Sequence, residues 1–168
     1  TAGDDALNGR VELWSRALYA IQDFPFTGCG LGAFRQVVHI LYPLFTVAPG
    51  TDLAHAHNVF LQVALDLGLP GLIAYLALVG TALWLGWHVA RSPLASGASP
   101  ATAPQENAAE FRWLGMGLVG GLVAYHVYGL ADTVALGAKP GFALWMLLGL
   151  AAALWRVAVP ASPELPEA

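Results

Sequence analysis

The sequence feature that most constrains this chain is a long stretch without charged residues. Residues 69–90 contain no Asp, Glu, Lys or Arg, and most of their side chains are apolar. A helix needs about 17 to 25 mostly apolar residues to cross the hydrocarbon core of a bilayer. The stretch therefore predicts a membrane-spanning helix, and the apolar residues 113–131 and 141–159 predict two more.

Composition supports a membrane protein and excludes several other classes. Of the 168 residues, 57% are hydrophobic and 11% are charged, whereas soluble domains average about 25% charged residues. The net charge of -4 and the lack of a basic cluster give no electrostatic support to a nucleic-acid partner. The single cysteine, Cys29, excludes an intramolecular disulfide and a cysteine-based metal site, and no cofactor is expected.

Residues 1–58 differ from the rest because they mix charged, apolar and glycine residues. Apolar residues recur at helical spacing over residues 10–21, which predicts an amphipathic helix with Asn8 as its N-cap. Residues 34–45 form a second amphipathic stretch. Because the sequence starts at Thr1 without a methionine, it is interpreted as part of a longer chain.

The remaining residues, 59–168, form the predicted membrane region of an all-α, multi-pass helical bundle. A short interfacial helix is expected over residues 59–67, and the Gly-Leu-Pro-Gly sequence at 68–71 breaks it before the first span. The small, proline-rich residues 91–112 predict a flexible loop, and residues 160–168 predict a polar tail.

Orientation follows from the arginines, because positive residues in short loops stay on the cytoplasmic side. Arg91 and Arg112 border the loop, and Arg156 ends the third span. The loop and the tail are therefore predicted to be cytoplasmic, and residues 1–58 are predicted to be extracytoplasmic.

The densest polar site is Asp-Leu-Ala-His-Ala-His-Asn at residues 52–58. It is either an inert interfacial loop or a site in which one histidine acts as a general base, because imidazole titrates near neutral pH. A metal site would use His55, His57 and Asp52, but no further ligand in the sequence completes it, so no metal is predicted.

Arg10 is the second candidate, because it is expected in the first turn of its helix, where a cation is unfavourable unless an anion binds. A guanidinium beside free backbone N–H groups suits a phosphate. The alternative is an arginine that extends to lipid headgroups, and that alternative carries more weight for Arg16 and Arg35.

His126 and Asp132 are ionisable residues in or at the end of the second predicted span. Such residues are costly in a membrane and suggest a function by default. For Asp132, an ion pair with Lys139 that joins two helix ends is an equally good explanation.

Taken together, the motifs resemble the O-antigen ligase and polymerase superfamily. The ordered set is Gly-Arg-Val-Glu-Leu-Trp at 9–14, Pro-Phe-Thr-Gly-Cys-Gly at 25–30, His57-Asn58 separated by nine residues from Gly68-Leu69, Tyr-Gly-Leu-Ala-Asp at 128–132, and Gly-Ala-Lys-Pro-Gly-Phe at 137–142. The set corresponds to the C-terminal part of such proteins.

This resemblance implies a multi-pass protein of the bacterial inner membrane that uses glycans carried on undecaprenyl diphosphate. An acceptor hydroxyl, on a glycolipid, a glycan or a protein, would displace the lipid diphosphate with inversion and without a metal. His57 matches the histidine proposed as base, and Arg10 matches an arginine thought to bind diphosphate, with Arg35 as a second candidate. Asn58, His55 and Asp132 would support them.

One departure is that the family uses another essential arginine on an earlier segment. This chain lacks it unless Arg16 or Arg35 substitutes, so the chain alone is predicted to be inactive. A polysaccharide polymerase or a protein O-glycosyltransferase would show the same motifs. A membrane transporter or scaffold subunit, which would also have glycine-rich spans, is the alternative from a different class.

Overall fold

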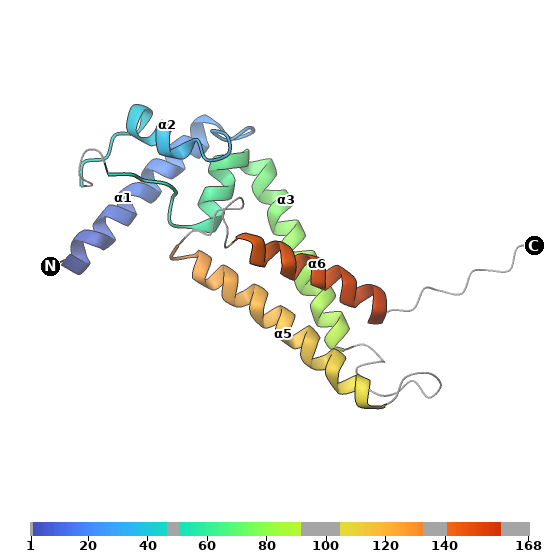
Figure 1. The fold of residues 1–168 in the computed structure, drawn as a ribbon. Helices are drawn as coiled ribbons and strands as arrows, with labels where there is room; N and C mark the ends of the chain where they lie inside the picture. The colour runs from blue at the N-terminus through green and yellow to red at the C-terminus, as the bar shows by residue number, and fades with distance from the viewer. Residues whose placement is uncertain (1, 47–50, 92–104, 133–140, 159–168) are drawn as a thin grey trace, which may run out of the picture. The chain divides into compact units, whose positions relative to one another are not determined.

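The computed structural model describes residues 2–46, 51–91, 105–132 and 141–158, and these residues form helices joined by turns, with no strand among them (Figure 1). The predicted all-α fold is confirmed. The five helices are α1 (Ala2–Asp23), α2 (Phe34–Leu41), α3 (Val59–Ala90), α5 (Gln105–Gly129) and α6 (Gly141–Ala158).

Two of the described helices, α3 and α6, are long and apolar enough to cross a membrane. Many large apolar side chains on these helices are exposed in the structure, such as Ile73 and Trp145. Lipid would cover such side chains in a membrane. Helix α5, which includes residues 113–129 of the predicted span 113–131, is not one of the two, so that span stays a prediction.

The first amphipathic helix, α1, begins earlier in the sequence than predicted. It begins at Ala2, so Asn8 lies inside the helix and is not an N-cap. The helix extends in the N-terminal direction because residues 2–9 contain no proline to stop it.

Two other helix ends also differ from the prediction. Helix α5 begins at Gln105, so residues 105–112 are helical and not loop, because Pro104 is the last proline before a run of good helix formers. The rest of the predicted loop, residues 92–104, lies outside the described residues. Helix α2 ends at Leu41 and not at residue 45, because Pro43 cannot continue the helical hydrogen bonds.

The chain divides into two compact units, and α3, α5 and α6 contribute residues to both. One unit comprises residues 1–78 and 125–142, and the other comprises residues 79–124 and 143–168. In the second unit, a Cβ on Gly115 would lie 2.7 Å from Gly86 O. Gly115 therefore permits a close approach of α5 to α3, as small residues do between helices in membranes. An added Cβ at Gly117 or Gly120 would meet nothing within 4 Å.

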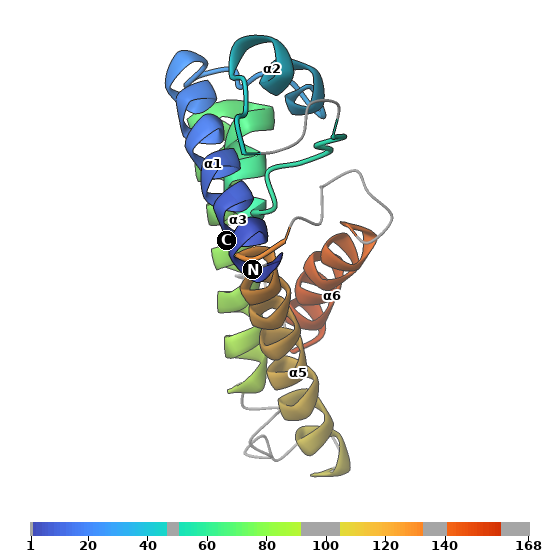
Figure 2. The same cartoon turned by 90° about the vertical axis from the view of Figure 1, so that its left-hand side faces the viewer.

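The core of the first unit lies where α1, α2 and the beginning of α3 meet (Figure 2). Helix α1 buries one face at helical spacing, and α2 buries two side chains against it. The fully or almost fully buried members from these helices are Leu13, Ala17, Ala20, Phe34, Val38, Ala64 and Leu65.

Helix α3 is interrupted at Gly68, inside the predicted break, where φ is 71° and ψ is -175°. An uninterrupted helix would join Leu69 N to Leu65 O. Instead Leu69 N donates to Pro25 O at 2.7 Å, and Leu65 O accepts from Cys29 N at 2.6 Å. The turn that follows α1 therefore supplies the backbone partners that the break removes.

Candidate functional site

His57 lies at the start of α3 in a strained backbone conformation. Its φ is 48°, and it is the one non-glycine residue with positive φ in the part of the chain that the structure describes. Such conformations are uncommon for residues with a Cβ and persist where the surroundings enforce them. They often occur at functional sites, and this one falls on the predicted general base.

Two hydrogen bonds hold the residue immediately before His57. Ala56 is fully buried, its N–H donates to Gln62 Oε1 at 2.9 Å, and its carbonyl accepts from Trp14 Nε1 at 2.9 Å. Both ends of the Ala56 backbone are therefore fixed by side chains from α1 and α3. This clamp enforces the unusual conformation of His57.

A buried carboxylate orients the glutamine of the clamp. Asp66 Oδ1 accepts from Gln62 Nε2 at 2.9 Å and from Gly32 N at 3.2 Å, and both side chains of α3 are almost fully buried. With its nitrogen toward Asp66, the Gln62 amide must present its oxygen to Ala56. Trp14, Gln62 and Asp66 were not predicted as site residues from the sequence. A carboxylate at position 66 in an apolar helix was the available signal.

His57 is paired with Asp132, which follows α5. His57 Nδ1 lies 2.9 Å from Asp132 Oδ1, and their side chains are 34% and 37% exposed. Asp132 Oδ2 also accepts from Tyr128 OH at 3.1 Å. When Nδ1 donates to the carboxylate, Nε2 is the nitrogen that can accept a proton, as in a catalytic histidine oriented by an acid.

Asn58 connects the two elements that carry this pair. Its Oδ1 caps α3 by accepting from Phe60 N at 3.0 Å and Leu61 N at 3.1 Å. Its Nδ2 donates to Leu130 O at 3.2 Å, two residues before Asp132. The structure therefore brings the predicted supporting residues Asn58 and Asp132 together with His57.

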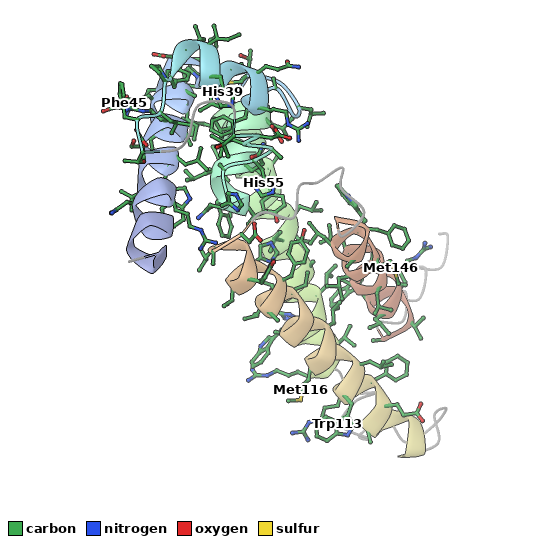
Figure 3. All side chains as sticks on the ribbon, turned by 60° about the vertical axis from the view of Figure 1, so that its left-hand side comes forward. His39, Phe45, His55, Trp113, Met116 and Met146 are labelled. Atoms are coloured by element: carbon green, nitrogen blue, oxygen red, sulfur yellow. The ribbon has the colours of Figure 1, made fainter. Side chains whose placement is uncertain are left out.

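His55, which is labelled in Figure 3, has its ring centroid 4.3 Å from that of His57. Its Nδ1 is buried and has no hydrogen-bond partner in the structure. Burial lowers the pKa of His55, and the neighbouring His57 lowers this pKa further. His55 therefore favours its neutral form.

The carboxylate beside the two histidines is not the one considered from the sequence. Asp52 forms an ion pair with Arg35, whose Nε lies 2.7 Å from Asp52 Oδ1. The carboxylate beside His55 and His57 is Asp132, and these three residues each offer a ligand atom within 4.8 Å of the other two. Asp52 is nearer to the histidines in sequence. In the fold, however, the residues after α5 lie beside the start of α3, so Asp132 is the carboxylate that pairs with His57.

Arg10 does not lie in the first turn of its helix, where it was predicted to lie. Arg10 is the ninth residue of α1 and is exposed, so it does not lie beside free N–H groups at the N-terminus. It does lie one helical turn before Trp14, and residues at this spacing share a helix face. Because Trp14 contacts Ala56, this face of α1 is the one next to the loop before α3 that carries His57, the His57 loop.

The other polar candidates have partners of their own. Arg16 lies 3.6 Å from Glu12, and His126 Nε2 lies 2.8 Å from Tyr75 OH. The predicted ion pair of Asp132 with Lys139 involves a residue outside the described part of the chain. Among the described residues, Asp132 contacts His57.

The apolar helices are typical of a helical membrane protein, and the His57–Asp132 pair forms a site suited to general-base chemistry. Residues 1–76 match the family model described as O-Antigen ligase. The chain is also 27% identical over 146 residues to an O-antigen ligase of Pseudomonas aeruginosa, a match that covers 87% of this chain. These findings confirm the resemblance to the O-antigen ligase family that the motifs predicted. The match spans about 30% of the length of that relative.

Proposed function

We propose that the protein transfers a glycan from undecaprenyl diphosphate to an acceptor hydroxyl in the synthesis of lipopolysaccharide or another cell-surface polysaccharide. The observation that carries the proposal is the His57–Asp132 pair at 2.9 Å. His57 lies in the segment that matches the O-antigen ligase family, and the buried clamp on Ala56 holds it in place.

In the proposed reaction, Nε2 of His57 takes the proton of the acceptor hydroxyl. The hydroxyl oxygen attacks the anomeric carbon of the donor sugar, and the bond from that carbon to the diphosphate oxygen breaks. Undecaprenyl diphosphate leaves from the opposite face, so the anomeric centre is inverted. Asp132 stabilises the imidazolium that forms, and base catalysis of this kind typically contributes about 10² to 10⁴ in rate.

Negative charge develops on the departing diphosphate, and a guanidinium can stabilise it without a metal ion. Arg10 is the first candidate for this role because it is exposed and lies on the face of α1 next to the His57 loop. Arg35 is the second, although its Nε is occupied by Asp52, so it would bind diphosphate through its terminal nitrogens. Arginine suits this task because its donors form a planar fork.

We further propose that the protein lies in the bacterial inner membrane with His57 on the extracytoplasmic face. The arginines Arg91, Arg112 and Arg156 support this orientation through the positive-inside rule. The donor lipid would then reach the site from the bilayer.

The test is glycan transfer from an undecaprenyl-diphosphate donor by the natural full-length protein, in a strain without its own ligase. His57→Ala should abolish transfer while the protein level in the membrane stays unchanged. His39→Ala is the matched control, because His39 is an exposed histidine on α2 (Figure 3). Transfer retained by His57→Ala would remove the base role, and loss of transfer in both variants would show a nonspecific effect.

A further inference from the structure

His55 is a feature of the site that base catalysis by His57 does not explain. The proposed reaction uses His57 and Asp132, yet a second imidazole is placed with its ring centroid 4.3 Å from that of His57. Its Nδ1 is one of two buried side-chain nitrogens in the described residues that have no hydrogen-bond partner. A buried polar atom without a partner costs free energy, so a ligand for this nitrogen would remove a penalty.

The three side chains lie close together. His55, His57 and Asp132 each place a possible ligand atom within 4.8 Å of the other two, and all three are partly exposed. The residues come from two segments, the loop before α3 and the turn after α5, which Asn58 holds together through Leu130. The ligand atoms are therefore held by tertiary structure and not by a flexible tail.

The donor set is chemically selective. Two imidazole nitrogens and one carboxylate oxygen suit Zn²⁺ and similar transition metals, whereas Mg²⁺ and Ca²⁺ prefer sites made only of oxygen. Three protein ligands leave one position of a tetrahedral ion open. An ion in such a site can exchange with the solution.

We propose that His55, His57 and Asp132 bind a divalent transition-metal ion, Zn²⁺ above all, and that the bound ion reversibly blocks the base. The metal-binding part stands on the geometry alone, and the blocking part rests on the proposed function. Coordination through Nε2 of His57 occupies the lone pair that must take the proton. Coordination through Nδ1 replaces its hydrogen bond to Asp132 and leaves the ring proton on Nε2, which then has no lone pair for the acceptor proton. In both cases the ion competes with the acceptor proton, and its removal restores the base.

The first test measures binding, with Co²⁺ as a spectroscopic probe of the purified natural full-length protein in detergent. The wild type and His39→Gln should develop the visible absorption of Co²⁺ bound by nitrogen and oxygen ligands, and Zn²⁺ should remove it. His55→Gln should lose most of this absorption. Absence of the signal in the wild type, or an undiminished signal in His55→Gln, would overturn the metal site.

The second test measures glycan transfer during a Zn²⁺ titration, with each variant normalised to its own rate in a metal chelator. Zn²⁺ should inhibit the wild type and His39→Gln, the chelator should restore transfer, and His55→Gln should need at least about tenfold more Zn²⁺. Mg²⁺ at the same concentrations should have no effect. Equal inhibition of His55→Gln, or activation of the wild type by Zn²⁺, would overturn the blocking role.

The two tests separate this inference from the proposed function. If the wild type transfers no glycan in the chelator, the proposed function fails, and the Co²⁺ titration still decides whether the metal site exists. If transfer depends on His57 but no metal binds, the inference fails and the proposed function stands.

Discussion

Gly28 offers a direct test of how the turn after α1 docks against the break in α3. An added Cβ at Gly28 would lie 2.5 Å from Leu65 O, 2.7 Å from Asp66 C and 2.7 Å from Gly68 N. All three contacts are backbone atoms, which cannot move aside as a flexible side chain can. We therefore expect Gly28→Ala to push the turn away from α3.

Gly32 provides a matched control for the backbone conformation. Its φ is 68°, against 65° for Gly28, but a Cβ there would meet nothing within 4 Å. Both alanine variants carry the cost of a left-handed residue, about 1 to 2 kcal/mol. Gly28→Ala adds overpacking of about 1 to 3 kcal/mol and weakens the hydrogen bond from Cys29 N to Leu65 O, which contributes about 1 kcal/mol. The expected total is about 3 to 6 kcal/mol.

The assay is unfolding in detergent micelles followed by tryptophan fluorescence, with the free energy of unfolding compared among the wild type, Gly28→Ala and Gly32→Ala. Gly28→Ala should lose about 2 to 4 kcal/mol more than Gly32→Ala, which is the part due to overlap and the lost hydrogen bond. Equal losses, within about 0.5 kcal/mol, would refute the close approach of this turn to α3.

Two other substitutions test the arginine and the clamp. Arg10→Lys should lose most glycan transfer because lysine cannot reproduce the forked contact with diphosphate, and a near-normal rate would favour the lipid-headgroup explanation. Gln62→Met should lower the free energy of unfolding by about 2 to 4 kcal/mol. It leaves the buried Ala56 N–H without a hydrogen-bond partner, and it removes the hydrogen bond that Gln62 Nε2 donates to Asp66. The same change at the exposed Gln22 should cost no more than about 0.5 kcal/mol, and a comparable loss there would contradict the clamp.

Local sequence was sufficient for the helical class and for the break at Gly68. Apolar runs without charge are a property of neighbouring residues, and a Gly-Leu-Pro-Gly sequence interrupts a helix wherever it occurs. Helix ends were less predictable, as the early starts of α1 and α5 show. A cap residue such as Asn8 is only a preference, and a helix continues through it when no proline stops it.

The family motifs, read from the sequence, also identified His57 and Asp132 as candidates. They did not identify their contact, because the two residues are 75 positions apart. The nearer carboxylate, Asp52, was the natural choice for the histidines, but it pairs with Arg35. Hydrogen-bond partners of this kind depend on which segments fold against each other, and hydropathy does not encode that.

The sequence by itself determined the helical membrane-type fold, the family resemblance and the identity of the histidine proposed as base. The tertiary structure decided how that histidine is held. Trp14 and Gln62 fix Ala56, and Asp132 reaches His57 from the end of α5. The physical reason is that apolar character acts over neighbouring residues, whereas a site requires polar atoms at hydrogen-bond distance, which only the packing of distant segments provides.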